Sequence, residues 1–294
     1  MSRKKEWLPF EEARKIVRKD AVLCGIDTER KWQYQKKYLY KRASNIPYSP
    51  QIAYKDSGWI SWADWLGTNN IRGQLKKYTV NHDFFKRWSA DMAYILGFWW
   101  ADGYIRKRKG RYGYSYGFGI CQHSRAKYLL RKIMDCMGAN NPVWQPKSRP
   151  DMCHFELISK TIFDDIIIHG GKQRKSKTIR MPKIPNKYFP DFIRGLFDGD
   201  GCIFKFNKKR SCSSYICSGS KKFLNDLKKI MEDKGFKTNI YSNGNKKHPC
   251  FKLCFGVVQT RKLGNFMYKN YKNKLLLKRK FEMFKTAGEQ TYEF

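Results

Sequence analysis

Two aspartates, Asp102 and Asp200, stand at matching places in the chain, and each precedes a glycine at the end of an apolar segment. If each segment is a helix, each carboxylate lies at a helix C-terminus, where the macrodipole is negative. Carboxylates brought together there repel each other, so the arrangement is favourable only with a bound cation. Mg²⁺ takes oxygen ligands, commonly one or two carboxylates with waters and substrate phosphates. The pair therefore predicts metal-assisted, in-line displacement at a phosphate.

The two aspartates belong to an internal repeat. Residues 95–103 read ILGFWWADG, and residues 193–201 read IRGLFDGDG, 98 positions later. Two further pairs of similar segments follow in the same order at nearly the same offset: 131–134 with 228–231, and 155–158 with 251–254. Three ordered matches predict two copies of one unit over about residues 89–285.

Each copy has the same expected order of elements. An apolar helix ends in Asp-Gly, and segments of alternating Tyr, Phe and Ile follow, such as residues 111–121 in the first copy and 202–217 in the second. An amphipathic helix, two more strands and a shorter helix come next, with the later strands of the first copy around 142–147 and 153–159. This order predicts an α+β fold made of two helix–strand–strand–helix–strand–strand–helix halves.

The motif helices are expected to pack side by side. Each has two small residues four positions apart, which lie on one helical face: Gly97 with Ala101, and Gly195 with Gly199. Small residues let two helix backbones approach closely, and this packing would bring Asp102 and Asp200 together at one end. Gly103 and Gly201 follow the aspartates, where a left-handed C-cap residue is expected.

Charge dominates the composition. Among 294 residues there are 61 Lys and Arg but 25 Asp and Glu, a formal net charge of +36. Such a field attracts polyanions, and nucleic acid is the first candidate. An anionic membrane surface is the alternative, but no apolar run approaches the about 18 residues of a spanning helix, and the start of the chain lacks a signal-peptide core. With 41% hydrophobic residues, most of the chain is expected to fold.

Cysteine usage indicates an intracellular protein. The nine cysteines are scattered and form no C-x-x-C pair, so their spacing gives no support for a zinc site. Reduced thiols in an intracellular chain are the expectation, with host and compartment left open.

The paired motifs resemble those of the LAGLIDADG homing endonucleases in their single-chain, two-motif form. The resemblance covers about residues 89–285 and implies a pseudo-two-fold saddle of two αββαββα halves, whose antiparallel sheets straddle double-stranded DNA and each read half of a long site. It also implies that Asp102 and Asp200 are the metal-binding catalytic acids of a monomeric, Mg²⁺-dependent endonuclease, with Mn²⁺ as a substitute. The family's earlier motif aspartate is kept as Asp198 but is Trp100 in the first copy, which affects the symmetry of helix packing.

The resemblance implies further site residues. Gln122 is the candidate for a polar side chain on the strand floor, and Lys177 and Lys274 are candidates for a basic residue near the metals. Basic and aromatic residues that follow each motif on the expected strands are candidates for DNA contact: Arg106, Arg108, Arg111, Tyr114, Lys205, Lys208 and Arg210.

The first 88 residues lie outside the repeat. Residues 6–67 are similar to a small repeat unit found beside phage-type integrases, which implies an accessory module over 1–67 that contacts DNA; a packing appendage is the alternative. Its three closely spaced tryptophans, Trp59, Trp62 and Trp65, require a core of their own or a place on the main body. Residues 68–88 read as a linker before halves at 89–190 and 191–294.

Three functions fit the sequence. The first is a site-specific endonuclease that cuts both strands and is mobile with an intron or a free-standing gene. The second is a maturase that binds intron RNA, and the third is a non-cutting DNA-binding regulator on the same scaffold. Retention of both Asp102 and Asp200 favours cutting, because a pure binder needs no paired acids at a repelling site. The number of bound metals stays open.

Overall fold

The computed structural model divides the chain into two compact units, Met1–Lys77 and Tyr78–Phe294. The residues that it describes are 6–42, 45–68, 78–110, 113–205, 212–242, 249–269 and 275–287. None of the helices in these ranges is long and apolar enough to cross a membrane. Residues 78–88, expected to be linker, belong to the second unit, where Phe85 of the 3-10 turn η2 (Phe84–Lys86) is buried in the core.

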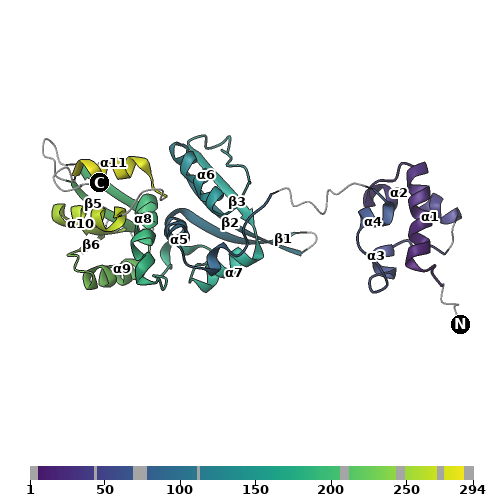
Figure 1. The fold of residues 1–294 in the computed structure, drawn as a ribbon, viewed down its shortest axis with the longest axis horizontal. Coiled ribbons are helices and arrows are strands. Elements are labelled where there is room, and N and C mark those ends of the chain that lie inside the picture. The colour runs from purple at the N-terminus through teal and green to yellow at the C-terminus, as the bar shows by residue number, and fades with distance from the viewer. Residues whose placement is uncertain are drawn as a thin grey trace. The chain divides into compact units, whose positions relative to one another are not determined.

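The first unit is a small helical module (Figure 1). Its helices are α1 (Phe10–Leu23), α2 (Glu29–Arg42), α3 (Pro50–Ala53) and α4 (Trp62–Leu66). Trp65 is fully buried and its ring lies within 6.0 Å of the rings of Phe10, Tyr54, Trp32 and Trp59. The tryptophans expected to need a core thus form one of their own.

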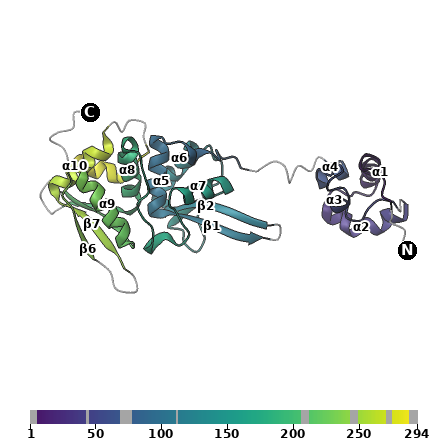
Figure 2. The same ribbon diagram turned by 90° about the horizontal axis from the view of Figure 1, so that it is seen from below.

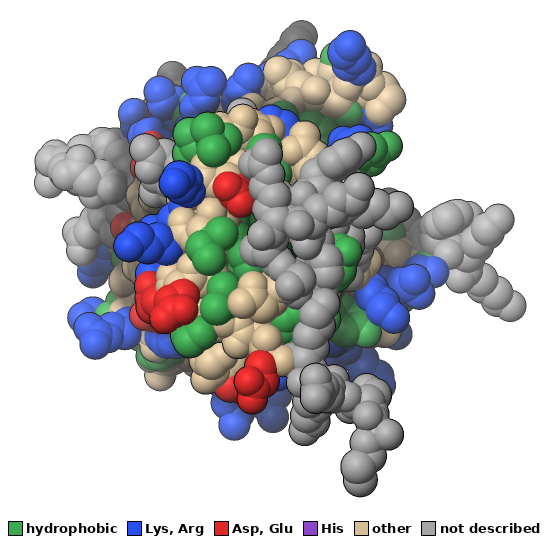
Figure 3. Space-filling view, turned by 90° about the vertical axis from the view of Figure 1, so that its right-hand side faces the viewer, with side chains coloured by type: hydrophobic (Ala, Val, Ile, Leu, Met, Phe, Trp, Pro, Cys, Tyr) green, Lys and Arg blue, Asp and Glu red, His purple; other side chains and the backbone are tan. Residues whose placement is uncertain are grey.

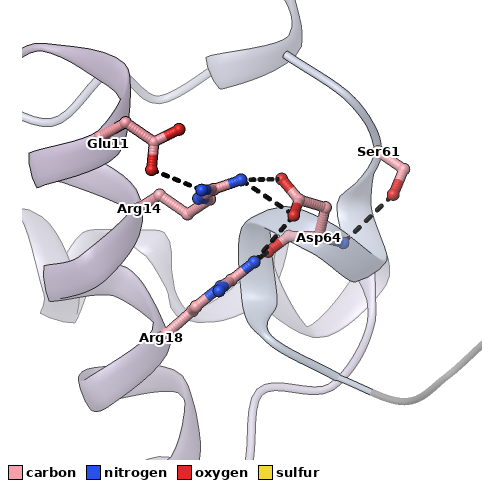
Figure 4. Close-up of polar contacts among 5 residues, drawn as sticks. All are labelled: Glu11, Arg14, Arg18, Ser61 and Asp64. Carbon is pink, nitrogen blue, oxygen red and sulfur yellow. Dashed lines mark hydrogen bonds and ion pairs between the residues drawn. The ribbon is translucent and has the colours of Figure 1, made fainter. Parts of the chain in front are cut away.

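Polar contacts join α1 to α4 in this module (Figure 4). Asp64 accepts two hydrogen bonds from Arg14 NH1, at 2.9 and 2.8 Å, and one from Arg18 NH2 at 2.8 Å. The Ser61 hydroxyl accepts from the Asp64 backbone N–H at 3.1 Å and so caps α4. The helix ends at Gly67 in the left-handed conformation, with φ 64°.

The first half of the second unit carries a three-stranded antiparallel sheet in the order β1-β2-β3. Its elements are α5 (Ala90–Asp102), β1 (Gly103–Gly110), β2 (Gly113–His123), α6 (Lys127–Cys136), β3 (Met152–Ile158) and α7 (Lys160–Ile168). The strand expected at 142–147 is reduced to one bridge, Trp144 to His154. Pro142 and Pro146 lie in that segment, and proline cannot donate to a strand ladder.

The second half repeats this order with a four-stranded antiparallel sheet, β4-β5-β7-β6. Its elements are α8 (Phe189–Asp200), β4 (Gly201–Lys205), β5 (Cys212–Ser218), α9 (Lys221–Asp233), β6 (Asn239–Ser242), β7 (Phe251–Phe255), α10 (Val257–Tyr268) and α11 (Lys278–Ala287). The α+β fold with two antiparallel sheets is therefore confirmed.

The two motif helices, α5 and α8, lie side by side at the centre of this unit (Figures 1 and 2). Every residue of α5 from Met92 to Trp100 is buried. A helix that is apolar all round must be covered on all sides, and α5 has α8 on one side and its own sheet on another. One continuous hydrophobic core therefore runs through both halves.

Candidate active site

Two glycines let α5 and α8 touch backbone to backbone. A Cβ added at Gly97 would lie 2.1 Å from the carbonyl oxygen of Phe192, and one added at Gly195 would lie 2.0 Å from that of Tyr94. Real Cβ atoms do not approach oxygen so closely, so a larger residue at either position must push the helices apart. The two glycines fix the helix separation from opposite sides of the interface.

The same close approach continues to the helix ends. A Cβ at Gly199 would lie 2.3 Å from the Ala101 Cβ and 2.9 Å from Oδ2 of Asp102. The last turn of α8 is therefore in contact with the last turn of α5. Both helices end at their motif aspartate, so Asp102 and Asp200 emerge at the same edge of the pair.

The glycines after the aspartates are not left-handed, contrary to the expectation. Gly103 has φ −88° and ψ 163°, and Gly201 has φ −80° and ψ 151°, both extended. Their small size is needed for another reason. A Cβ at Gly103 would lie 2.1 Å from the Trp99 ring, and one at Gly201 would lie 2.5 Å from the Phe197 ring. Each chain therefore turns from helix directly into strand across an aromatic ring.

The surroundings of Asp102 and Asp200 disfavour the charged form of both carboxylates. Burial raises the pKa of Asp102 to about 7, and the nearby negative charge of Asp200 adds to the rise. Burial also raises the pKa of Asp200. Neighbouring Lys175 and Lys280 lower both pKa values but only partly offset the burial. A cation at this edge would relieve the penalty, because it favours the charged form of each carboxylate.

Gln122 holds the Asp102 carboxylate directly. Its Nε2 donates to Oδ2 of Asp102 at 2.7 Å, and its Oε1 accepts from the backbone N–H of His123 at 2.8 Å. The amide is thus fixed at both ends. In the second sheet, the register places Ser218 where the first has Gln122, since Gly103 pairs with Ile120 and Gly201 with Ile216. The two halves of the site are not chemically identical.

A buried lysine lies behind each aspartate, and the sequence pattern did not single out either one. Lys175 Nζ donates to the carbonyls of Trp100 and Ala101 at 2.5 and 2.8 Å. Lys280 Nζ donates to the carbonyls of the three residues before Asp200, at 2.7, 2.8 and 3.2 Å. Both side chains are nearly inaccessible, with exposures of 7% and 4%.

Lys177 and Lys274 were the candidates for this role, and the structure brings a different lysine, Lys175, to the end of α5. Lys177 is exposed, and the lysine that reaches the end of α5 stands two positions earlier. Lys274 lies outside the described residues. Burial lowers the pKa of Lys175 to about 8, while the charges of Asp102 and Asp200 oppose that change. Each of these two lysines lies in a segment rich in basic residues, 172–177 or 278–280, so only its burial distinguishes it.

Asp198 and Trp100 make the helix pair asymmetric, as expected from the sequence. Oδ2 of the fully buried Asp198 accepts from the Tyr94 hydroxyl and from the Leu277 backbone N–H, both at 2.7 Å. The Trp100 indole instead donates to the Arg180 carbonyl at 3.0 Å. Asp198 therefore ties α5 to the start of α11, the helix that carries Lys280.

Residues 191–265 match the family model of a LAGLIDADG-like domain. This range holds the second of the two motifs, with Asp198 and Asp200. The resemblance inferred from the two motifs is confirmed, while the resemblance of residues 6–67 to an integrase-associated unit stays a prediction.

The curated relatives that the chain matches are much longer. An uncharacterised protein of Methanocaldococcus jannaschii is 23% identical over 219 residues, which is 71% of this chain and 24% of that protein. The tRNA-splicing ligase RtcB of Pyrococcus furiosus is 26% identical over 210 residues, 61% of this chain and 21% of that protein. The chain thus spans about a quarter of the length of these relatives or less.

Solved structures of LAGLIDADG proteins are also similar to the chain. The homing endonuclease I-DmoI in complex with DNA and Ca is 17% identical with a TM-score of 0.47, over 67% of this chain and 96% of that chain. The LAGLIDADG meganuclease I-AabMI bound to uncleaved DNA is 9% identical with a TM-score of 0.46, over 67% and 89% of the two chains.

The donor set at the ends of α5 and α8 suits a hard, oxygen-seeking cation. Within the described ranges there is no group of three or more His, Cys, Asp and Glu side chains that could hold a metal ion. Two adjacent carboxylates, Asp102 and Asp200, are what Mg²⁺ takes when waters and substrate phosphates complete its shell. The raised pKa values of both carboxylates point the same way.

Four of the residues expected to contact DNA lie on described strands, β1, β2 and β4. Arg106 and Arg108 are on β1, Tyr114 is 55% exposed on β2, and Lys205 is exposed at the end of β4. The Nζ of Lys107 lies 4.2 Å from the Tyr114 ring centroid. The remaining candidates lie outside the described residues: Arg111, Lys208 and Arg210.

Basic side chains are widespread on the surface. Figure 3 shows many Lys and Arg side chains (blue) and fewer Asp and Glu side chains (red) among the residues drawn there. With a formal net charge of +36, the protein has a positive field that attracts a polyanion before any specific contact forms.

Proposed function

We propose that the chain is a site-specific endonuclease that cuts both strands of a DNA duplex with the help of Mg²⁺. The observation that carries the proposal is the pair of half-buried carboxylates, Asp102 and Asp200, held at one edge of two touching helices. The LAGLIDADG-like domain and the positive net charge support it.

The residues of the site have separate tasks in this proposal. Asp102 and Asp200 would hold divalent metal, which when bound activates water and stabilises the leaving oxygen. Gln122 orients the Asp102 carboxylate through its 2.7 Å hydrogen bond. Lys175 and Lys280 neutralise the negative helix ends and help to keep both carboxylates ionised.

One chain completes the site, which supports a monomer. Each half supplies one aspartate and one buried lysine, so no second copy is needed to pair them. Mn²⁺ in place of Mg²⁺, an intracellular location, intron mobility and an accessory DNA contact by residues 6–67 are parts of the same proposal. They rest on the sequence alone.

The test is a cleavage assay on a randomised duplex library with Mg²⁺ or Ca²⁺, followed by sequencing of the cut ends. Asp102→Asn or Asp200→Asn should abolish double-strand cutting while duplex binding persists, because each change removes charge and keeps the side-chain volume. Asp233→Asn, at an exposed carboxylate on α9, is the matched control and should cut like the wild type.

The alternatives give different results in the same assay. A maturase would bind intron RNA with no Mg²⁺-dependent cutting of any duplex, and a regulator would bind one DNA site and leave it whole. Full double-strand cutting by the Asp102→Asn, Asp200→Asn double variant would overturn the assignment of both acids.

A further inference from the structure

A carboxylate lies on the open face of the first sheet. The other face is covered by α6 and α7, and Ile105, Phe155 and Leu157 point into that core. Side chains alternate across a sheet, so Tyr104, Arg106 and Glu156 share the uncovered face. In a protein with this excess of positive charge, a carboxylate on that face requires an explanation.

Glu156 is held by two partners from β1. Its Oε2 accepts from the Tyr104 hydroxyl at 3.0 Å, and its Oε1 forms an ion pair with NH2 of Arg106. The Arg106 guanidinium carbon lies 5.8 Å from the Tyr104 ring centroid. The Glu156 side chain is 13% exposed and that of Arg106 is 35% exposed, so the cluster is ordered yet open on one side.

Two glycines of the central strand make room for this cluster. A Cβ at Gly119 would lie 2.3 Å from the Tyr104 ring. A Cβ at Gly117 would lie 3.0 Å from Oε1 of Glu156 and 3.1 Å from Cγ of Arg106. The sheet is therefore built to hold these three side chains flat across β2.

The fold itself does not require the cluster, as the second sheet shows. Gly103 and Gly201 begin equivalent strands, and Ile120 pairs with Phe155 as Ile216 pairs with Leu253. These registers place uncharged residues where the first sheet has Tyr104, Arg106 and Glu156: Cys202, Phe204 and Cys254. The same architecture forms without any charge at these positions, so the sheet topology alone does not account for the cluster of the first sheet.

The charges of Arg106 and Glu156 indicate which part of a DNA duplex the cluster would contact. A carboxylate on a DNA-facing surface repels phosphates and weakens general affinity, so it is useful only against a base edge. In the major groove, Arg pairs with O6 and N7 of guanine, and Glu accepts from N4 of cytosine. Arg106 has Nε and NH1 without a hydrogen-bond partner within the described residues, so these donors are available to a ligand.

We infer that Tyr104, Glu156 and Arg106 together read one G·C base pair in the half-site that faces the first sheet. Arg106 donates to guanine, and Glu156 fixes the guanidinium and accepts from the cytosine amino group. The equivalent positions of the second sheet offer only thiols and a phenyl ring, so the two half-sites differ in composition. This inference rests on the proposed function, because it takes the open sheet face to lie against DNA.

The experiment measures binding of the full chain in Ca²⁺ to duplexes that carry each of the four base pairs at every position of the selected site. The wild type should lose about tenfold to a hundredfold in affinity at one position when G·C is replaced. Glu156→Gln and Arg106→Lys should flatten the preference at that position alone. Arg106→Lys is the decisive variant, since it keeps the charge and loses the guanidinium fork.

Two controls separate base reading from general contact. Cys254→Ser, at the position equivalent to Glu156, should leave this preference intact. Arg108→Gln, at an exposed residue on the same face of β1 as Arg106, should lower affinity for all duplexes alike. A thermal unfolding scan tests whether each variant is folded. If Glu156→Gln does not fold, Tyr104→Phe replaces it in the experiment. Tyr104→Phe should weaken the preference for G·C at the same position.

Two results would overturn the inference. One is an unchanged G·C preference in both Glu156→Gln and Arg106→Lys, and the other is an equal loss of affinity for every duplex. Failure of the proposed function is seen separately, as an absence of Mg²⁺-dependent cutting by the wild type. Selective binding without cutting would contradict the proposed nuclease activity but would support base reading by the cluster.

Discussion

Lys175 and Lys280 occupy corresponding places at the ends of the two motif helices. Lys175 donates to the carbonyls of the two residues before Asp102, and Lys280 to those of the three residues before Asp200. Each ammonium therefore satisfies carbonyls that a helix end leaves free, and it brings a positive charge beside a half-buried carboxylate. The first comes from a 3-10 turn and the second from α11, so different local structures give the same local chemistry.

Removal of either lysine charge should impair cutting. Lys175→Met or Lys280→Met should lower the Mg²⁺-dependent cleavage rate by on the order of a hundredfold, the cost of losing one electrostatic partner in an enclosed site. The activity should also move to higher pH, because each lysine lowers the pKa of Asp102 and its loss raises that pKa further. Cleavage rates measured from pH 6 to 9 check both effects.

Lys177→Met is the matched control for these variants, because Lys177 is exposed and close in sequence. It should keep the wild-type rate and pH profile. Equal losses in Lys175→Met and Lys177→Met would contradict the separate role of the buried lysine.

The stability of the metal-free protein should fall as pH rises from about 4 to about 7. Burial raises the folded-state pKa of Asp102 from 3.8 to about 7, so in this window the folded state keeps a proton that the unfolded chain releases. Stability is therefore complete below the unfolded pKa and is lost as pH rises through the folded one. Urea unfolding with a chelator present, at pH 5 and pH 8, measures the change.

Asp102→Asn isolates this contribution from the other carboxyl groups. The variant should be more stable than the wild type at pH 8 without metal, and the advantage should shrink at pH 5. Added Mg²⁺ should raise the melting temperature of the wild type much more than that of the variant, since the cation stabilises the charged carboxylate. A metal response that is the same in both proteins would exclude Asp102 as a ligand.

Gly97→Ala should destabilise the second unit by about 3 kcal/mol or more, because the added methyl group meets a backbone oxygen of α8 at 2.1 Å. Gly256→Ala is the matched control: its φ is −66°, and an added Cβ meets nothing within 4 Å. Denaturant unfolding compares the two. A Gly97→Ala protein as stable as Gly256→Ala would mean that the helices are not held in contact.

Asp64→Ala should unfold the N-terminal module at lower temperature and leave the second unit unchanged. The substitution removes the ion pairs to Arg14 and Arg18, whose side chains are partly exposed, so the loss should be about 1 kcal/mol. The hydrophobic clusters of the two units are separate, so two transitions are expected in calorimetry. A shift of both transitions together would show that the units unfold as one.

The duplicated fold and the close packing of the two motif helices could be predicted from the sequence, because repeats and residue size are local properties of the chain. The spacing of Gly97 and Ala101 on one helical face holds for any helix, so the pairing of α5 with α8 and the shared edge of Asp102 and Asp200 follow from the motif. Charge composition likewise requires no coordinates. The prediction of a strand at 142–147 was wrong, because the prolines in that segment cannot donate hydrogen bonds to a strand ladder.

What the sequence by itself determined is the duplicated α+β plan and the two acids at its centre, since helical periodicity and repeats are written in consecutive residues. Only the tertiary structure decided which two of the lysines in the described ranges are buried, Lys175 and Lys280, and that Glu156 joins Arg106 across the first sheet. Burial and pairing depend on segments distant in the chain that fold together. A lysine in a basic run carries no local sign of the carbonyls it will meet.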